Sequence, residues 1–106
     1  MEKQISVPLK LSSGEYITLP LIYSISNENG NDNIRLMNCR VNLPDNELPE
    51  WLSPAVFTIR EVYSPGSYGA VGVTLTEFSS IPCKNIDSAN FVGAVHDHIN
   101  LKEKLS

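Results

Sequence analysis

The strongest constraint on the fold is an alternation of apolar and polar residues in the first 25 positions. In segment 4–11 every odd position is apolar and every even position is polar or proline, and the same phase resumes in segment 16–25 after a short turn. A period of two predicts half-buried strands, and two in-phase strands around a short turn predict a β-hairpin. Pro8 and Pro20 occupy outward positions. Because proline has no N–H for a ladder, each is expected at an edge or a bulge.

A third strand is expected over residues 34–43. The segment 26–33, rich in Asn and Asp, precedes it and predicts a polar loop. The apolar phase of the strand slips near Leu36 and Met37. One inserted residue accounts for such a slip, so a β-bulge is predicted there.

Two more strands follow a connector bounded by prolines, residues 44–54. Asp45 is expected to cap one short helical turn in this connector. A fourth strand is expected over about 55–63 and a fifth over 70–78, joined by a turn with Pro ahead of Gly. Gly72 lies on the small-residue face of the fifth strand, which predicts close packing of another segment against it.

The period changes near the C-terminus. Phe91, Val95 and Ile99 recur four residues apart, after a suitable N-cap pair at Asp87 and Ser88. This spacing predicts one amphipathic helix over about residues 88–100.

These elements predict one domain over residues 1–106, since no repeat or linker divides the chain. The expected fold class is mainly β, with one C-terminal helix. A five-stranded antiparallel sheet and a small OB-like barrel both fit five strands in this order, and the sequence leaves that choice open.

The charge and composition of the chain argue against nucleic-acid-binding and membrane-binding proteins. Eight basic residues are scattered among twelve acidic ones, giving a net charge of −4. Nucleic-acid binding needs clustered cations and membrane binding needs a basic amphipathic helix, so neither is expected. The start of the chain lacks an apolar leader, which predicts a cytoplasmic protein. Cys39 and Cys83 are therefore expected as two reduced thiols.

No pattern in the chain predicts catalysis. His96 and His98 flank Asp97, but on a helix their side chains diverge by roughly 200°, so a solvated helix face is expected rather than a zinc site. The polar segment 27–33 lacks the spacing of a calcium loop. Nucleophile and phosphate-binding motifs are absent from the sequence. We therefore expect no catalytic residue, no metal and no cofactor.

The candidate partner-binding residues are aromatic or acidic and lie in two connections. Trp and Tyr flanked by charge are frequent anchors of protein interfaces. Trp51 equally fits a role in the core, because Trp is highly buried on average, and both interpretations stay open. The candidates are Asp45, Glu47, Glu50, Trp51, Tyr63 and Tyr68.

The function expected from these features is that of a small, acidic, non-enzymatic protein-binding module. Its size and charge suit an inhibitor in a phage or bacterial conflict system, either an anti-defence protein such as an anti-CRISPR or a toxin-immunity protein. The acidity favours a partner with a basic surface or groove, such as a nuclease or a nucleic-acid-guided complex.

Two alternatives belong to other classes. An OB-like protein that binds single-stranded nucleic acid would stack bases on Tyr16, Tyr23, Tyr63 or Tyr68. A structural subunit of a virion or secretion apparatus would add its strand edges to neighbouring subunits.

Overall fold

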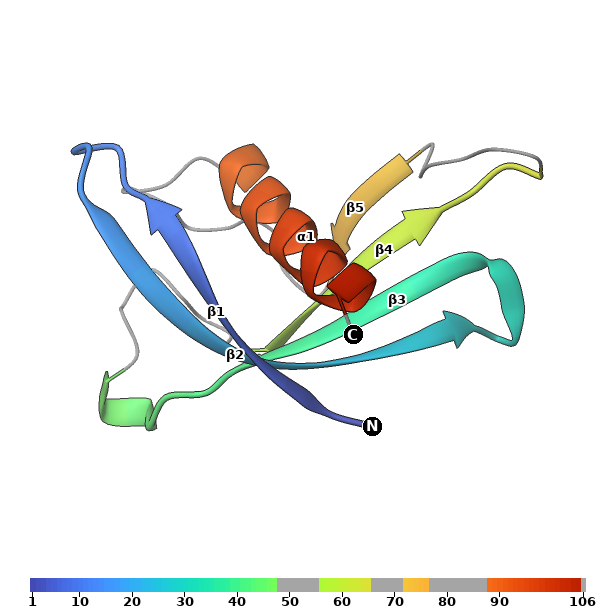
Figure 1. The fold of residues 1–106 in the computed structure, drawn as a ribbon, viewed down its shortest axis with the longest axis horizontal. Coiled ribbons are helices and arrows are strands. Elements are labelled where there is room, and N and C mark those ends of the chain that lie inside the picture. The colour runs from blue at the N-terminus through green and yellow to red at the C-terminus, as the bar shows by residue number, and fades with distance from the viewer. Residues whose placement is uncertain (48–55, 66–71, 77–87, 106) are drawn as a thin grey trace.

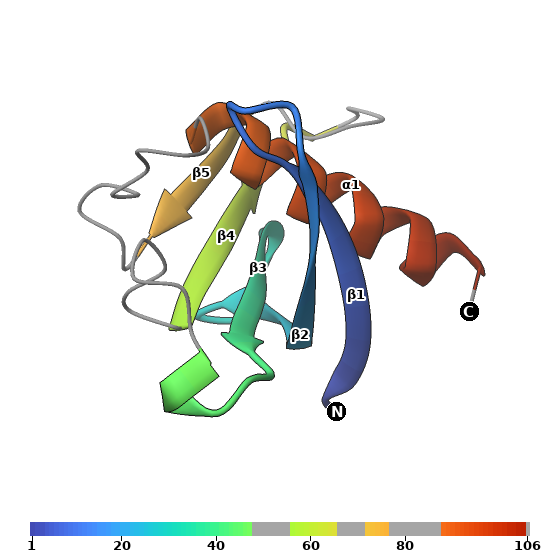
Figure 2. The same cartoon turned by 90° about the vertical axis from the view of Figure 1, so that its left-hand side faces the viewer.

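The computed structural model describes residues 1–47, 56–65, 72–76 and 88–105, in which five antiparallel strands form one open sheet (Figure 1). Each strand lies next to the one before it in sequence: β1 (Lys3–Lys10), β2 (Tyr16–Glu28), β3 (Asn31–Val41), β4 (Val56–Val62) and β5 (Gly72–Thr76). One helix, α1 (Ser88–Leu105), lies across the concave face (Figures 1 and 2). The mainly-β fold with a C-terminal helix is confirmed, and it is an open sheet with edges at β1 and β5.

The first hairpin forms as its alternation predicts. Val7 pairs with Leu19 and Leu9 with Ile17, and all four side chains point toward α1. Pro8 lies on the edge strand β1, as expected. Pro20 instead lies within the interior strand β2, where the Asn42 N–H donates to its carbonyl oxygen at 2.9 Å, one position beyond the first β2–β3 pair. Its missing N–H therefore falls where the β2–β3 ladder ends.

The predicted polar loop over residues 26–33 is wrong. β2 continues through Glu28 and β3 begins at Asn31, so only Asn29 and Gly30 form the turn. Both have positive φ, at 51° and 74°. An Asn–Gly pair favours this type I′ turn because its backbone twist matches that of the flanking strands. Strand pairing therefore extends into a polar sequence.

The predicted bulge near Leu36 and Met37 is also wrong. β3 pairs without interruption with β2 over 35–41 and with β4 over 34–40, and the register shift lies at Asn27/Glu28 of β2 instead. The apparent slip has a different cause. Leu36 stays on the outer face, while Arg35 continues the inner face of Met37 and brings a charge under the helix. Inner and outer positions therefore alternate regularly along β3, and the inner position at residue 35 holds a charged residue instead of an apolar one.

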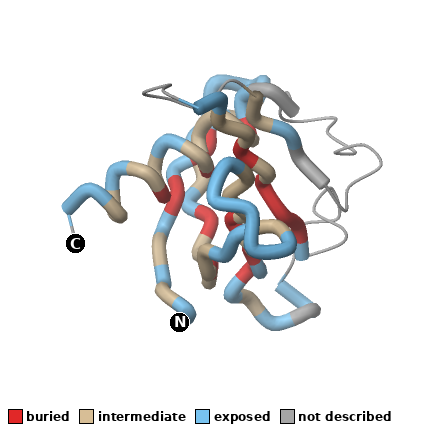
Figure 3. The backbone as a smooth tube through the Cα atoms, turned by 90° about the vertical axis from the view of Figure 1, so that its right-hand side faces the viewer, coloured by how far each residue is buried: buried red, intermediate tan, exposed pale blue. Residues whose placement is uncertain are grey.

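The core lies between the sheet and α1. Phe91, Val95 and Ile99 are fully buried, as the helix prediction requires, and α1 continues five residues past the expected end at 100. The Phe91 ring packs edge-on against Phe57 of β4, with centroids 5.2 Å apart. Figure 3 shows the buried positions concentrated in the sheet and in α1. The sheet contributes Val7, Leu9, Leu19, Leu21, Tyr23, Met37, Cys39, Val41, Phe57 and Ile59.

The structure also bears on the predictions for the connector, for Gly72 and for the start of α1. A 3-10 turn at Asp45–Glu47 confirms the short helical turn in the connector, closed by a hydrogen bond from the Glu47 N–H to the Pro44 carbonyl. Among the described residues no atom lies within 4 Å of where a Cβ on Gly72 would sit, so none of them provides the close packing predicted there. Asp87, the expected cap of α1, lies outside the described residues. Within them, α1 lacks the apolar length needed to cross a membrane.

Candidate functional site: a helix–sheet polar network

Three of the six predicted partner-binding residues lie outside the described part of the chain. Glu50, Trp51 and Tyr68 belong to this group, and of Asp45 only the backbone is described. Glu47 is exposed on the 3-10 turn. The two interpretations of Trp51 thus both remain predictions.

Tyr63, the last of the predicted residues, lies at the opposite end of β4 from the 3-10 turn. The turn follows the end of β3 where Arg40 pairs with Val56, the first residue of β4, whereas the Tyr63 N–H bonds to the Asn33 carbonyl at 2.8 Å just after β4 ends. A seven-residue strand separates these ends by about 20 Å. Glu47 and Tyr63 therefore do not form one continuous contact surface.

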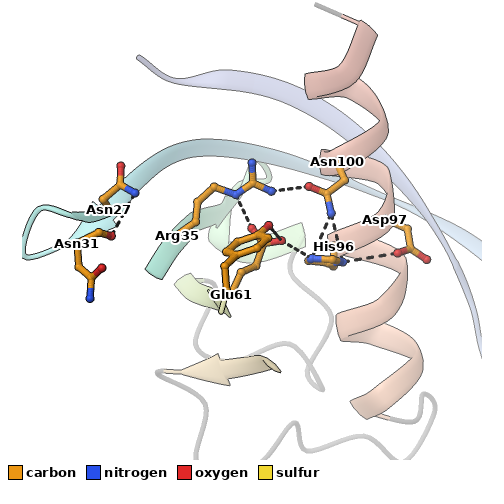
Figure 4. A network of polar contacts seen from close by, with 8 residues as sticks. Asn27, Asn31, Arg35, Glu61, His96, Asp97 and Asn100 are labelled. Carbon is orange, nitrogen blue, oxygen red and sulfur yellow. Dashed lines mark hydrogen bonds and ion pairs between the residues drawn. The ribbon is translucent and has the colours of Figure 1, made fainter. Parts of the chain in front are cut away.

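Tyr63 belongs instead to a polar network between the sheet and the helix, which we call the helix–sheet network. Glu61 on β4 lies directly opposite Arg35 on β3, and both point toward α1 (Figure 4). The helix contributes two side chains one turn apart. The members are Arg35, Glu61, Tyr63, His96 and Asn100.

Glu61 is the centre of the network, and its side chain is fully buried. One carboxylate oxygen accepts a hydrogen bond from Arg35 Nε at 2.5 Å. The other accepts from the Tyr63 hydroxyl at 3.0 Å and lies 2.6 Å from His96 Nε2. Arg35 also donates through Nη2 to Asn100 Oδ1 at 2.6 Å. Three elements are joined through one carboxylate.

The electrostatics keep Glu61 ionised. Burial raises the pKa of this carboxyl, but the hydrogen bonds from Arg35 and His96 outweigh burial and hold the pKa below the ordinary value. An ionised carboxylate only accepts, so His96 donates from Nε2. Burial and the hydrogen bond to Glu61 raise the pKa of Tyr63, so its hydroxyl stays a neutral donor.

A second polar cluster extends the contact toward β1. The Glu103 carboxylate accepts from Lys3 Nζ and from the Tyr23 hydroxyl, both at 2.8 Å. These two bonds lower the pKa of Glu103. Burial and the bond to Glu103 raise the pKa of Tyr23, which is 1% exposed. Tyr23 is therefore inaccessible as a stacking platform for a base, whereas Tyr16 is exposed.

The sequence alone does not predict this network, for identifiable reasons. His96 was expected on a solvated helix face, yet its side chain is only 16% exposed; the expectation is right for Asp97, at 80%. A signal exists in the spacing: His96, Asn100 and Glu103 follow one another at i, i+4 and i+7 beside the apolar stripe of α1. Such residues share a helix face and can contact one partner surface.

The network is built to hold elements together. A buried carboxylate beside a histidine is a combination that general acid–base catalysis uses. Here both Glu61 oxygens already accept bonds from within the protein, and no buried side-chain nitrogen or oxygen of the described residues lacks a partner. Removing one partner of such a buried pair costs several kcal/mol, because a charge is left uncompensated. The arrangement therefore acts as a clamp between α1, β3 and β4.

The remaining reactive groups among the described residues give no second site. Cys39 is a free, buried thiol, and burial raises its pKa to about 12, which suppresses the nucleophilic thiolate. Among the described residues, no three His, Cys, Asp or Glu side chains gather as metal ligands would. Cys83 lies outside those residues, so its state stays a prediction.

Comparison with known proteins adds no family. No protein-family model matches this chain, and neither a curated protein nor a solved structure matches it. The functional conclusion therefore rests on the residues and their geometry.

Proposed function

We propose that this protein is a small, non-enzymatic binding module that acts by occupying a surface of another protein. One observation carries the proposal: Arg35, Glu61 and His96 have the chemistry for catalysis, yet they bond to one another between helix and sheet, with Glu61 fully buried and 27% of Arg35 and 16% of His96 exposed. An interior clamp that fixes α1 on the sheet yields a rigid body. A rigid surface loses little conformational entropy on binding, which favours affinity.

The charge of the chain supports a partner of the opposite sign. The net charge is −4, and the connector that carries the exposed Glu47 also contains Asp45 and Glu50. Complementary charge speeds the encounter with a basic surface and suppresses wrong partners. We propose a basic nuclease or nucleic-acid-guided complex as the target. The module would then be an inhibitor in a phage or bacterial conflict system, through anti-defence or toxin immunity.

A pair of charge-reversal variants tests the contact surface. The test variant carries Glu47→Lys with Glu50→Lys, and the control carries Glu15→Lys with Asp32→Lys on exposed sites elsewhere. Each substitution adds two charges, so both variants change the net charge from −4 to 0. Any difference in binding between them then reports the position of the charges and not their sum.

The assay is affinity capture from cell lysate followed by surface plasmon resonance against the captured protein at two salt concentrations. We expect slower association for the connector variant, wild-type association for the control, and loss of the difference at high salt. Equal association rates for both variants would refute the connector as the contact surface. Capture of nucleic acid that survives nuclease treatment would favour a nucleic-acid-binding role.

A further inference from the structure

The turn between β2 and β3 contains a residue pair with its own covalent chemistry. Asn29 is the only asparagine of the chain that is followed by glycine. The side-chain carbonyl of an asparagine can be attacked by the backbone nitrogen of the next residue, and the attack is easiest where that residue has no side chain. Because the reaction is intramolecular, the positions of the two groups control its rate.

The structure leaves both reacting groups accessible. Asn29 and Gly30 are exposed, and among the described residues no atom lies within 4 Å of where a Cβ on Gly30 would sit. Within the same residues, neither the Asn29 side chain nor the Gly30 N–H makes a hydrogen bond. The neighbouring asparagines differ, since Asn27 Nδ2 donates to the Asn31 carbonyl at 3.3 Å and Asn31 Oδ1 accepts from the Asn33 N–H at 2.9 Å.

The turn must open for this attack, because Asn29 has to rotate about its Cα–C bond to bring the two groups together. The type I′ turn holds Asn29 and Gly30 at positive φ and opposes that rotation. Beyond the register shift at Asn27/Glu28, however, a single residue pair, Glu28 and Asn31, closes the turn. Exposed segments with few contacts open at a small free-energy cost. Transient opening therefore gives the Gly30 nitrogen access to the Asn29 side chain.

The opening is confined to the tip of the hairpin, because the chain is anchored on both sides of it. On the β2 side, the Glu28 carboxylate accepts from Arg60 Nε at 3.2 Å and from Arg60 Nη2 at 3.1 Å. On the β3 side, the Asn33 carbonyl accepts from the Tyr63 N–H at 2.8 Å. Residues 29–32 can therefore rearrange while the sheet beyond them keeps its register.

We propose that Asn29 undergoes spontaneous deamidation, which converts its neutral amide into a carboxylate. The Gly30 nitrogen attacks Asn29 Cγ. The new N–Cγ bond closes a succinimide ring, the Cγ–Nδ2 bond breaks, and ammonia leaves with the proton of the Gly30 N–H. One water molecule then opens the ring. Cleavage of the N–Cγ bond gives aspartate in the normal backbone, whereas cleavage of the bond to the main-chain carbonyl carbon gives isoaspartate.

Both products change the charge of the tip. Each adds one carboxylate next to Glu28 and near Asp32, so the net charge changes from −4 to −5. Aspartate is compatible with the turn, because Asp–Gly favours type I′ as Asn–Gly does. Isoaspartate lengthens the backbone by one carbon atom and does not fit a two-residue turn. This modification goes beyond the proposed function and does not depend on it.

Hydroxylamine tests the proposal, because it traps the succinimide and cleaves the chain there. Cleavage between Asn29 and Gly30 gives fragments 1–29 and 30–106, which mass spectrometry identifies. At mildly alkaline pH we expect the folded protein to be cleaved at a rate within about tenfold of the rate in urea, since opening the tip costs about 1.4 kcal/mol or less. Asn29→Gln is the matched control and should stay intact, because it keeps an amide but would close a larger, less favoured ring.

A parallel incubation without hydroxylamine, followed by peptide mapping, locates the new carboxylate. The peptide with Asn29 should gain it. Asn38 should not, because it is paired on both sides within β3 and its side chain is bonded to Ser26 and Thr58. Cleavage of the folded protein more than about tenfold slower than in urea would overturn the proposal, since the turn would then protect Asn29. Modification of another asparagine before Asn29, or cleavage of Asn29→Gln at the wild-type rate, would overturn it as well.

Discussion

Removing the guanidinium of Arg35 should expose the role of the buried Glu61 carboxylate. Arg35→Met keeps an unbranched side chain about as long as the aliphatic part of Arg and deletes the charged guanidinium. Glu61 is fully buried and Arg35 is 27% exposed, so the substitution removes the permanent cation that donates to the carboxylate at 2.5 Å and leaves a negative charge inside the protein. His96 and Tyr63 remain as donors but do not replace a permanent charge.

The expected destabilisation by Arg35→Met is a large share of the unfolding free energy of the whole protein. Breaking a buried ion pair by removing one partner typically costs about 3–5 kcal/mol. The partial exposure of Arg35 places the estimate near the lower end, about 3 kcal/mol. A domain of this size has a total unfolding free energy of about 5–15 kcal/mol. The variant should thus remain folded at low temperature and denature at much lower urea.

The double variant Arg35→Met with Glu61→Leu separates charge from packing. Replacing both members of a buried pair with apolar residues is often neutral, so the double variant should be more stable than Arg35→Met alone by about 1 kcal/mol or more. Urea denaturation followed by circular dichroism measures all three proteins. A loss below about 1 kcal/mol for Arg35→Met, the range of surface substitutions, would refute the clamp. A double variant less stable than the single one would also refute it.

Three further predictions address the fold. Phe91→Ala should cost about 3–5 kcal/mol, because the ring is fully buried against Phe57, and a cost below about 1 kcal/mol would contradict that packing. Gly30→Ala should destabilise by about 1–2 kcal/mol because its φ is +74°, whereas Gly93→Ala in α1, where a Cβ meets open space, should be neutral or stabilising. Equal effects on urea denaturation would contradict the type I′ turn. The Cys39 thiol should react with a disulfide reagent only on unfolding, since burial raises its pKa to about 12; fast labelling of the native protein at this residue, identified by peptide mapping, would contradict its burial.

The sequence predicts correctly those elements that have one apolar face and one polar face. The first hairpin has an apolar residue or Tyr at every odd position in 5–11 and 17–25, and the apolar stripe of α1 repeats every four residues. In both cases hydrophobic burial alone fixes the orientation, because any other orientation exposes the whole apolar set. The turn at Asn29–Gly30 is different, since local backbone geometry decides it against a polar composition.

The helix–sheet network was missed because its members break the simple pattern. Arg35 occupies an inner position of β3, where a charge looks like a change of phase. The side chain of Glu61 points inward on β4. Its charge is stabilised there because Arg35 lies opposite on β3 and because His96, 35 residues later in the chain, contacts it from α1. Such compensation depends on three-dimensional contacts between distant segments. Periodicity in one strand holds no information about a partner on another element.

The central claim is that Glu61 is ionised inside the protein and joins the sheet to α1. Burial raises the pKa of the Glu61 carboxyl, but the hydrogen bonds from Arg35 and His96 outweigh burial and hold the pKa below the ordinary value of 4.5. For a carboxyl whose pKa is lower in the folded state, the stabilisation is fully present above pH 4.5 and is lost as pH falls through the folded pKa. Protonation should therefore accompany loosening of the helix.

The most direct measurement is a pH titration of the Glu61 side-chain carboxyl by ¹³C NMR. The predicted result is a midpoint below 4.5, the ordinary value for a Glu carboxyl, and an upward movement of that midpoint in Arg35→Met. A Glu61 midpoint at or above 4.5 in the wild type would contradict an ionised clamp.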